Sequence, residues 1–276
     1  MSDPLNEVYE TIDRQHTDKP AATRRQIVAG AAAALGSAGL LAVAETAAAQ
    51  SALPQSRRND EPNTPENIVN IAATAEVLAT IVNTVGLERL GSQLDPTTRA
   101  NIEAAAREEL IHYEVLTSRT VGASPVTKRI WVPNAVFSSP SSLLSTLVTG
   151  DQIFINAYLL AVTVMGRAGG LAGSRFARIS AEFMGVEAVH RALALQSLGR
   201  LGNDRAFMLF GQVETNPVDA FNGTGGFYRI TDAVARLEKA GFGFGKEGAS
   251  PGTFYDFDQV AARTPNPAGV TTRVPS

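Results

Sequence analysis

Three stretches of this sequence begin with the same pair, a helix-capping residue followed by proline: Thr64-Pro65, Asp95-Pro96 and Ser139-Pro140. A Thr, Asp or Ser side-chain oxygen accepts hydrogen bonds from the free N–H groups of a first helical turn. Proline fits the first helical position because its nitrogen needs no partner there. The pairs therefore predict helix starts at residues 65, 96 and 140.

A long run of helical pattern follows each pair, and glycines stand just past the runs. Glycine is common immediately after a helix because it adopts the left-handed conformation that ends one. A fourth run follows the turn RAGGLAG and is expected to begin at Ser174. The sequence thus predicts helices over residues 65–89, 96–120, 140–167 and 174–200.

Four helices of such length predict an all-α fold, an antiparallel four-helix bundle. Short turns join the first pair and the last pair of helices. The segment GASPVTKRIWVPNAVFSS between the pairs is long enough for a crossover along the bundle, with Trp131 as an anchor against it. No periodic signal for strands appears in this region.

The predicted organisation has four parts. Residues 50–63 are polar and contain proline, which indicates a linker, and residues 64–202 form the bundle. Residues 203–276 hold many of the aromatic side chains in a Gly- and Pro-rich context. We expect an irregular extension with one short helix near 229–240 and an unstructured end. Its aromatics would fold back onto the bundle or pack in an oligomer such as a homodimer.

Residues 1–49 resemble a twin-arginine export signal, carried by Arg24 and Arg25. An Ala- and Gly-rich apolar run follows, and Ala47 and Ala49 give an A-x-A cleavage pattern. Cleavage after Ala49 would release a mature protein without a stable membrane span, in the periplasm or outside the cell. The alternative is an uncleaved anchor, because the apolar run of 27–44 has the minimum length of a spanning helix.

The net charge of -3 and the low charged fraction of 18% give no indication of nucleic acid as a partner. The chain has no cysteine, which excludes disulfides, thiolate metal ligands and a cysteine nucleophile.

A repeated pattern of acid and histidine marks the second and fourth predicted helices. REELIHYEVL places Glu109 three residues before His112, and VEAVHRALAL places Glu187 three residues before His190. Residues three apart lie on one face of a helix. Each pair therefore presents a carboxylate and an imidazole to the same neighbours.

The first and third predicted helices each carry one isolated acid within their apolar middle, Glu76 and Asp151. A lone buried acid is costly unless it is paired, protonated or bound to a cation. Asp151 follows Glu76 by 75 residues and Glu187 follows Glu109 by 78, as expected if the helix pairs are related by a pseudo-twofold axis.

One carboxylate from each of two helices and Glu-x-x-His from each of the other two resembles the ferritin-like di-iron carboxylate superfamily, and most closely its exported, desiccation-related type. FNGTGGFY after the bundle adds to this resemblance. It implies two Fe or Mn ions, bridging roles for Glu109 and Glu187, and terminal roles for Glu76 and Asp151. The implied ligands are Glu76, Glu109, His112, Asp151, Glu187 and His190.

Asp151 departs from the resemblance, since that position is usually Glu. The missing methylene withdraws the carboxylate by roughly 1.5 Å, about one C–C bond. The site could then be looser, hold one metal more firmly than the other, or have lost its chemistry. Gly150 could let the helix kink to compensate.

The remaining charged residues of the two Glu-x-x-His helices are interpreted as solvated faces: Glu103, Arg107, Glu108, Glu114, Arg175, Arg178, Glu182 and Arg191. For Tyr113 and Tyr158 two roles remain open, packing and hydrogen bonding to the ligands.

The resemblance implies redox chemistry on dioxygen or peroxide, as a ferroxidase or a peroxide-consuming stress protein. Two alternatives remain open at this point. The first is a structural, desiccation-related bundle with a vestigial site. The second is an iron-storing cage, which the long C-terminal extension disfavours.

Overall fold

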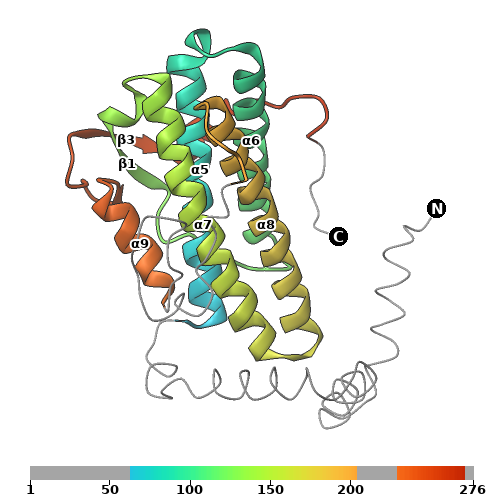
Figure 1. The fold of residues 1–276 in the computed structure, drawn as a ribbon. Helices are drawn as coiled ribbons and strands as arrows, with labels where there is room; N and C mark the ends of the chain where they lie inside the picture. Colours follow the sequence, from blue (N-terminus) through green and yellow to red (C-terminus); the bar gives the residue numbers. More distant parts are fainter. Residues whose placement is uncertain (1–62, 204–228, 271–276) are drawn as a thin grey trace, which may run out of the picture. The chain divides into compact units, whose positions relative to one another are not determined.

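In a computed structural model, the described residues are 63–203 and 229–270, and they are mostly helical (Figure 1). The predicted signal, nearly all of the linker and the FNGTGGFY motif lie outside these ranges. Four long helices lie side by side: α5 Pro65–Leu90, α6 Pro96–Leu116, α7 Pro140–Ala168 and α8 Gly170–Ser197. Helix α5 packs against α6 and α7, and α8 packs against α6 and α7.

The three predicted helix starts are confirmed. Thr64 accepts a hydrogen bond from the Asn67 N–H, and Ser139 accepts one from the Ser142 N–H. Asp95 accepts from the N–H groups of both Thr97 and Thr98. In each case proline is the next residue, so the sequence signal and the observed cap coincide.

Two predicted helix boundaries, the start of one helix and the end of another, are wrong by about one turn. Helix α8 begins at Gly170 and not at Ser174, so Gly169 alone connects it to α7. Gly169 and Gly170 have φ of 73° and 67°, a conformation that glycine adopts at low cost. Helix α6 stops at Leu116 rather than near residue 120, and its C-cap is Thr117.

The core lies between the long helices. The approach of α5 to α7 is close at Gly86, where an added Cβ would come within 2.7 Å of Leu143, which is fully buried. Helices α5 and α7 are long and apolar enough to cross a membrane by length and composition alone. Their most apolar windows are 72% and 56% buried within the protein, as expected for core helices.

A small antiparallel sheet was not predicted. Its central strand β1, Arg129–Pro133, lies in the predicted crossover. It pairs on one side with β2, Gly243–Phe244, and on the other with β3, Gly252–Asp256. Short 3-10 turns, η1 (Gly91–Gln93) and η2 (Asn134–Phe137), follow α5 and β1.

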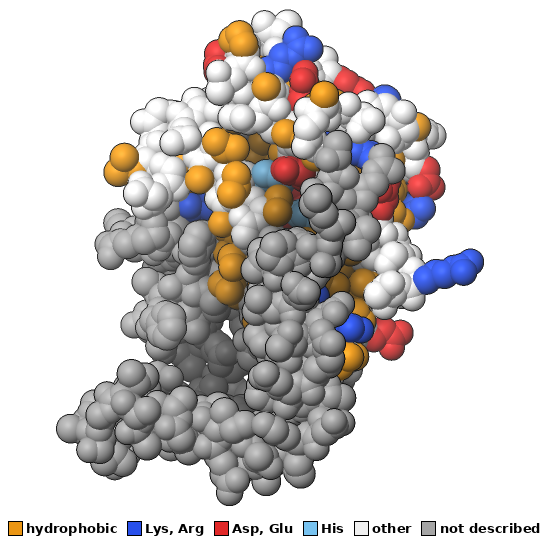
Figure 2. All heavy atoms as spheres, turned by 90° about the vertical axis from the view of Figure 1, so that its right-hand side faces the viewer, with side chains coloured by type: hydrophobic (Ala, Val, Ile, Leu, Met, Phe, Trp, Pro, Cys, Tyr) orange, Lys and Arg blue, Asp and Glu red, His pale blue; other side chains and the backbone are white. Residues whose placement is uncertain are grey.

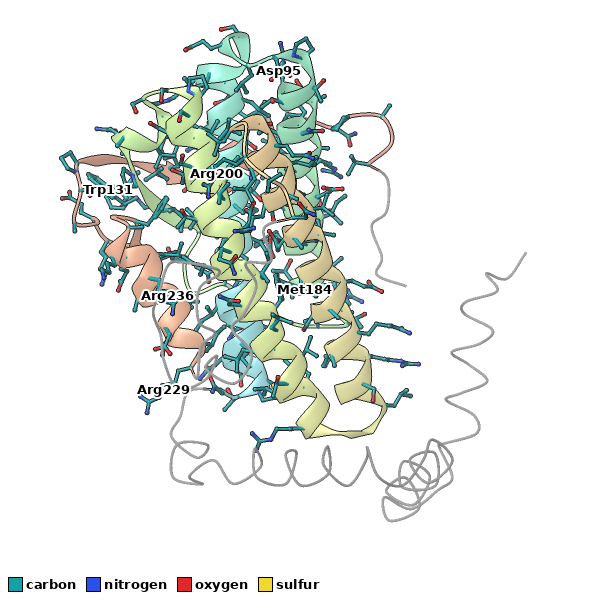
Figure 3. The ribbon with its side chains drawn as sticks, in the orientation of Figure 1. Asp95, Trp131, Met184, Arg200, Arg229 and Arg236 are labelled. Carbon is teal, nitrogen blue, oxygen red and sulfur yellow. The ribbon has the colours of Figure 1, made fainter. Side chains whose placement is uncertain are left out.

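Trp131 does not anchor the crossover to the helices as predicted. Its Nε1 donates to the carbonyl of Ser250 at 2.8 Å, and its ring meets Phe254 edge-on at 5.0 Å. Figure 3 shows its side chain beside the strands, away from the long helices. The anchor is therefore to the C-terminal segment, because the sheet places Trp131 opposite Phe254.

The predicted short helix of the extension is confirmed as α9, Ile230–Lys239, which packs against α5 and α7. A second helix, α10 (Phe257–Ala261), was not expected. Its Phe257 is buried and lies 4.3 Å from the ring of Tyr113 on α6. The described part of the extension thus folds back onto the long helices, and it is more regular than predicted.

Candidate metal centre

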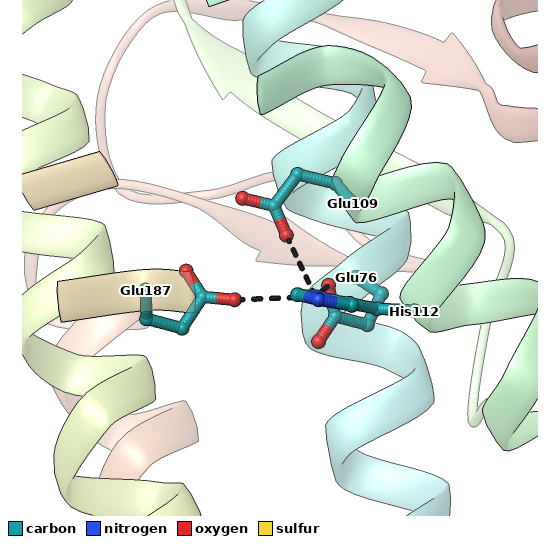
Figure 4. A group of neighbouring side chains, drawn as sticks. All are labelled: Glu76, Glu109, His112 and Glu187. Carbon is teal, nitrogen blue, oxygen red and sulfur yellow. Dashed lines mark ion pairs between the residues drawn. The ribbon is translucent and has the colours of Figure 1, made fainter. Parts of the chain in front are cut away.

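The predicted ligands lie on the four long helices, and all six are buried. Helix α5 supplies one acid and α7 another, while α6 and α8 each supply an acid and a histidine three residues later. Figure 4 shows four of them directed at one another, and their ligand atoms lie within 4.8 Å of each other: Glu76, Glu109, His112 and Glu187. This buried group can hold a metal ion.

The ring of His112 faces three carboxylates. Its Nδ1 lies 3.5 Å from Glu76 Oε2, 3.6 Å from Glu109 Oε2 and 3.4 Å from Glu187 Oε1. These distances are too long for good hydrogen bonds. They leave one imidazole nitrogen and three carboxylate oxygens around a common centre, and we call this group the His112 half-site.

The ring of His190 faces the other oxygens of the same two glutamates. Its Nδ1 lies 3.1 Å from Glu109 Oε1 and 3.7 Å from Glu187 Oε2. Glu109 and Glu187 therefore each direct one oxygen at His112 and the other at His190. The group around His190 Nδ1 is called the His190 half-site below.

Most of the atoms that face these centres lack hydrogen bonds. Among the described residues, Glu76 Oε2, Glu109 Oε2 and His112 Nδ1 are buried without a hydrogen-bond partner, and so are both oxygens of Glu187. Buried polar atoms are nearly always satisfied, and an unpaired buried carboxylate is costly. A cation between them would remove that cost, so the donor set fits a metal.

Burial raises the pKa of the Glu76 carboxyl from 4.5 to about 8, although the charge of His112 opposes the rise. Burial alone would lower the pKa of His112. The charge of Glu76 and the nearby carboxylates of Glu109 and Glu187 outweigh that effect, so the His112 pKa lies well above its usual value. In the metal-free protein, protons take the place that a cation would occupy.

Burial alone would also lower the pKa of His190. Hydrogen bonding to Glu108 and Glu109 outweighs that effect, so the His190 pKa lies well above its usual value. For Glu109, burial and the charge of Glu187 raise the pKa, but the nearby rings of His112 and His190 prevail and lower it. The Glu109 carboxyl is therefore charged beside the two histidine rings, because its pKa lies below the usual value.

Asp151 stands apart from the closely grouped four. It is buried on α7, and the charges that act most on it are those of Glu187 and His190. Burial and the Glu187 charge raise its pKa well above the usual value. It therefore belongs to the side of the His190 half-site, but its carboxylate does not join the group around His112.

Glu108 was interpreted as part of the solvated face, and this is wrong. Its Oε2 lies 2.6 Å from Nε2 of His190, and its side chain is only 36% exposed. Burial raises the pKa of Glu108, but hydrogen bonding to His190 prevails and lowers it. No local pattern indicates this contact, because it joins two residues that lie 82 positions apart in the chain.

Tyr158 of α7 contacts the site from one side. It is buried, and its hydroxyl donates to Oε1 of Glu76. Phe183 of α8 stacks on the His112 ring at 4.0 Å and meets Tyr158 edge-on at 5.6 Å. The two aromatics surround the His112 half-site with apolar surface. Tyr113, by contrast, packs against Phe257.

The remaining charged residues divide between buried and exposed positions. Arg107 and Arg191 were expected on solvated faces, but both are buried, at 8% and 6% exposure. Glu114 is exposed as predicted, and Glu103 pairs with Arg99 at 3.0 Å on the surface of α6. On the face drawn in Figure 2, histidine and carboxylate atoms are visible among hydrophobic side chains, so the cluster lies close beneath that face.

Comparison of the chain with models of known protein families, with curated proteins and with solved structures found no match.

Proposed function

We propose that this chain is an exported ferritin-like protein whose four long helices form a bundle around two Fe or Mn ions. The observation that carries the proposal is the placement of Glu109 and Glu187. Each has one oxygen toward His112 Nδ1 and the other toward His190 Nδ1. Two carboxylates that face two imidazoles in this way are suited to bridge a pair of cations.

The ligands divide between the half-sites. Glu76 and His112 would complete one, and His190 and Asp151 the other, with Glu109 and Glu187 shared. Four carboxylates offset the charge of two divalent cations, which makes deep burial tolerable. Oxygen and imidazole ligands without thiolate suit Fe and Mn.

A bound pair of these ions would supply redox chemistry on dioxygen or peroxide, which makes ferroxidase or peroxide-consuming activity the proposed reaction. The chain's own contribution is to direct Nδ1 of both rings toward Glu109 and Glu187 and to place Phe183 and Tyr158 beside the His112 half-site. The twin arginines Arg24 and Arg25 support export of the folded, metal-loaded protein.

Metal content tests the first part of this proposal. The protein is purified from its native exporter and its transition metals are counted per chain by mass spectrometry. We expect about two per chain, and fewer than one in Glu109→Gln. The matched control is Glu114→Gln, an exposed acid of the same helix, which should retain the full content. The site is rejected if the unaltered chain holds less than one metal and Glu109→Gln holds the same amount.

The reaction is tested separately, by the consumption of Fe(II) or hydrogen peroxide in single-turnover experiments. His190→Ala should abolish the rate, because it removes the only imidazole of its half-site among the described residues. A rate that is unchanged in this variant would place the chemistry elsewhere.

A structural, desiccation-related bundle with a vestigial site is the second candidate. The observation in its favour is Asp151, whose shorter side chain lies outside the closely grouped four. This candidate predicts one tightly held metal or none and no turnover. Metal content and single-turnover rates together therefore separate it from the first.

A further inference from the structure

A cavity of about 270 Å³ lies between α5, α7 and α9. Its walls are mainly apolar: Leu78 and Val82 come from α5, Leu147 and Phe154 from α7, and Leu237 from α9, and all five side chains are buried. Ser145, Thr149 and Ala240 also line it and are exposed, so they mark its opening to solvent.

Two buried polar residues also line this cavity, Asn83 of α5 and Asp151 of α7, with 2% and 4% exposure. Both also line a smaller void that contacts His190. They therefore lie at the inner end of the cavity, opposite its exposed residues, on the side of the metal centre.

One side-chain oxygen of each residue lacks a hydrogen bond. The amide nitrogen of Asn83 donates to the Ala79 carbonyl at 3.1 Å, which fixes the orientation of the amide. Its Oδ1 and Asp151 Oδ2 have no hydrogen bond to any described residue. A buried acceptor without a donor is unfavourable, so an apolar cavity that ends on the amide oxygen of Asn83 favours a molecule that brings a donor.

The size and the walls limit the molecule further. An apolar cavity of about 150 Å³ is enough for benzene, so this one has room for a benzene ring with a short alkyl chain. A charged head would cost more to bury than a hydroxyl group. We propose that this cavity binds a small apolar alcohol or phenol, whose body packs against the apolar walls and whose hydroxyl donates to Asn83 Oδ1.

The proposal goes beyond the metal centre, with which the cavity shares Asp151, and it rests on the oxygen of Asn83, which is not a proposed ligand. Binding is measured by isothermal titration calorimetry on the metal-free full-length protein, so a failure here is distinct from a failure to bind metal. The probes are 4-propylphenol and propylbenzene, which differ only in the hydroxyl group. We expect the phenol to bind about ten-fold more tightly, a difference of about 1.4 kcal/mol.

Two variants locate the binding site. Asn83→Leu removes the acceptor and should weaken binding of the phenol by about five- to ten-fold while leaving that of propylbenzene unchanged or stronger. Gly150→Leu adds a side chain at a position that lines the cavity and where a Cβ meets no atom within 4 Å. It should weaken binding of both probes by at least about ten-fold.

The same helix offers a control variant for the folding of these proteins. Gly166 of α7 also has no atom within 4 Å of an added Cβ, but it is exposed and does not line the cavity. Gly150→Leu and Gly166→Leu should both gain helix stability, since glycine is unfavourable within a helix. Only the first should lose binding. The proposal is overturned if 4-propylphenol shows no saturable binding, or binds both cavity variants as tightly as the unaltered protein.

Discussion

Nε2 of His190 lies 2.6 Å from Oε2 of Glu108. A carboxylate in this position accepts a hydrogen bond from the Nε2–H group. Nδ1 of the same ring therefore keeps its lone pair when the histidine is neutral. Nδ1 is the atom that faces Glu109 and Glu187. In the proposed two-metal site, Glu108 would therefore position His190 as a ligand, as carboxylates commonly do for metal-bound histidines.

Loss of Glu108 should weaken one half-site only. Glu108→Ala is expected to reduce the affinity for the second metal by about 10- to 100-fold and to leave the first metal almost unchanged. Glu108→Gln keeps an acceptor oxygen and should restore part of the loss. Calorimetric titration of metal-free protein with Mn(II) measures both steps, with Glu114→Ala as control. An equal loss at both steps would contradict a role through His190.

The metal-free protein should lose stability as the pH rises. Burial raises the pKa of Glu76 to about 8, and the pKa of His112 and His190 lies well above the usual value. The folded state then binds more protons than the unfolded state from about pH 4.5 upward, so the free energy of unfolding falls between pH 4.5 and about pH 8. Thermal unfolding at a series of pH values measures this.

Metal should reverse that trend, because binding displaces the protons and becomes stronger as the pH rises. The stabilisation by added Mn(II) is thus expected to increase from pH 5 to pH 8. Glu76→Gln mimics the protonated acid and should flatten the pH dependence of the metal-free protein. If its profile matches that of the unaltered protein, Glu76 is not a source of the effect.

Tyr158 should contribute both to stability and to the position of Glu76. In Tyr158→Phe, Oε1 of Glu76 loses the hydroxyl that donates to it. We expect the free energy of unfolding of the metal-free protein to fall by about 1–3 kcal/mol, the cost of an unsatisfied buried acceptor. Denaturant unfolding measures the loss. In Tyr113→Phe, the ring still packs against Phe257, and a much smaller change is expected.

Asp151→Glu should strengthen the weaker half-site. The added methylene extends the carboxylate by roughly 1.5 Å toward the ligand group. We expect a higher occupancy of the second metal, measured by metal analysis after dialysis against a limiting concentration of Mn(II). The paired control is Asp151→Asn, which keeps the length and removes the charge, and which should lower the occupancy. No difference among the three proteins would remove Asp151 from the ligand set.

The local signals of the sequence were reliable. Thr64, Asp95 and Ser139 cap helices as their prolines predicted, because a cap depends on a few neighbouring residues. The Glu-x-x-His spacing likewise places Glu109 beside His112 on one helix. Glu76 was identified because it is isolated in an apolar helix, and such a residue needs a partner from elsewhere.

Contacts between distant segments were missed. Strand β1 contains one proline and spans five residues, and β2 spans two, so neither carries a recognisable alternation. Glu108 resembles an ordinary surface acid, and only the approach of α8 to α6 brings His190 against it. Arg107 and Arg191 are also buried by the packing of one helix against another, which the sequence of a single helix does not show.

The sheet also governs the order in which this chain can fold. Strand β1 is central, and both of its neighbours come from residues 243–256, more than a hundred positions later. On a ribosome, helix α5 and helix α6 can meet long before either partner strand has been synthesised. Until then β1 would present two open edges, which are prone to pair with other chains. Completion of the fold must therefore wait for loop closure over a long distance, a slow step compared with helix pairing.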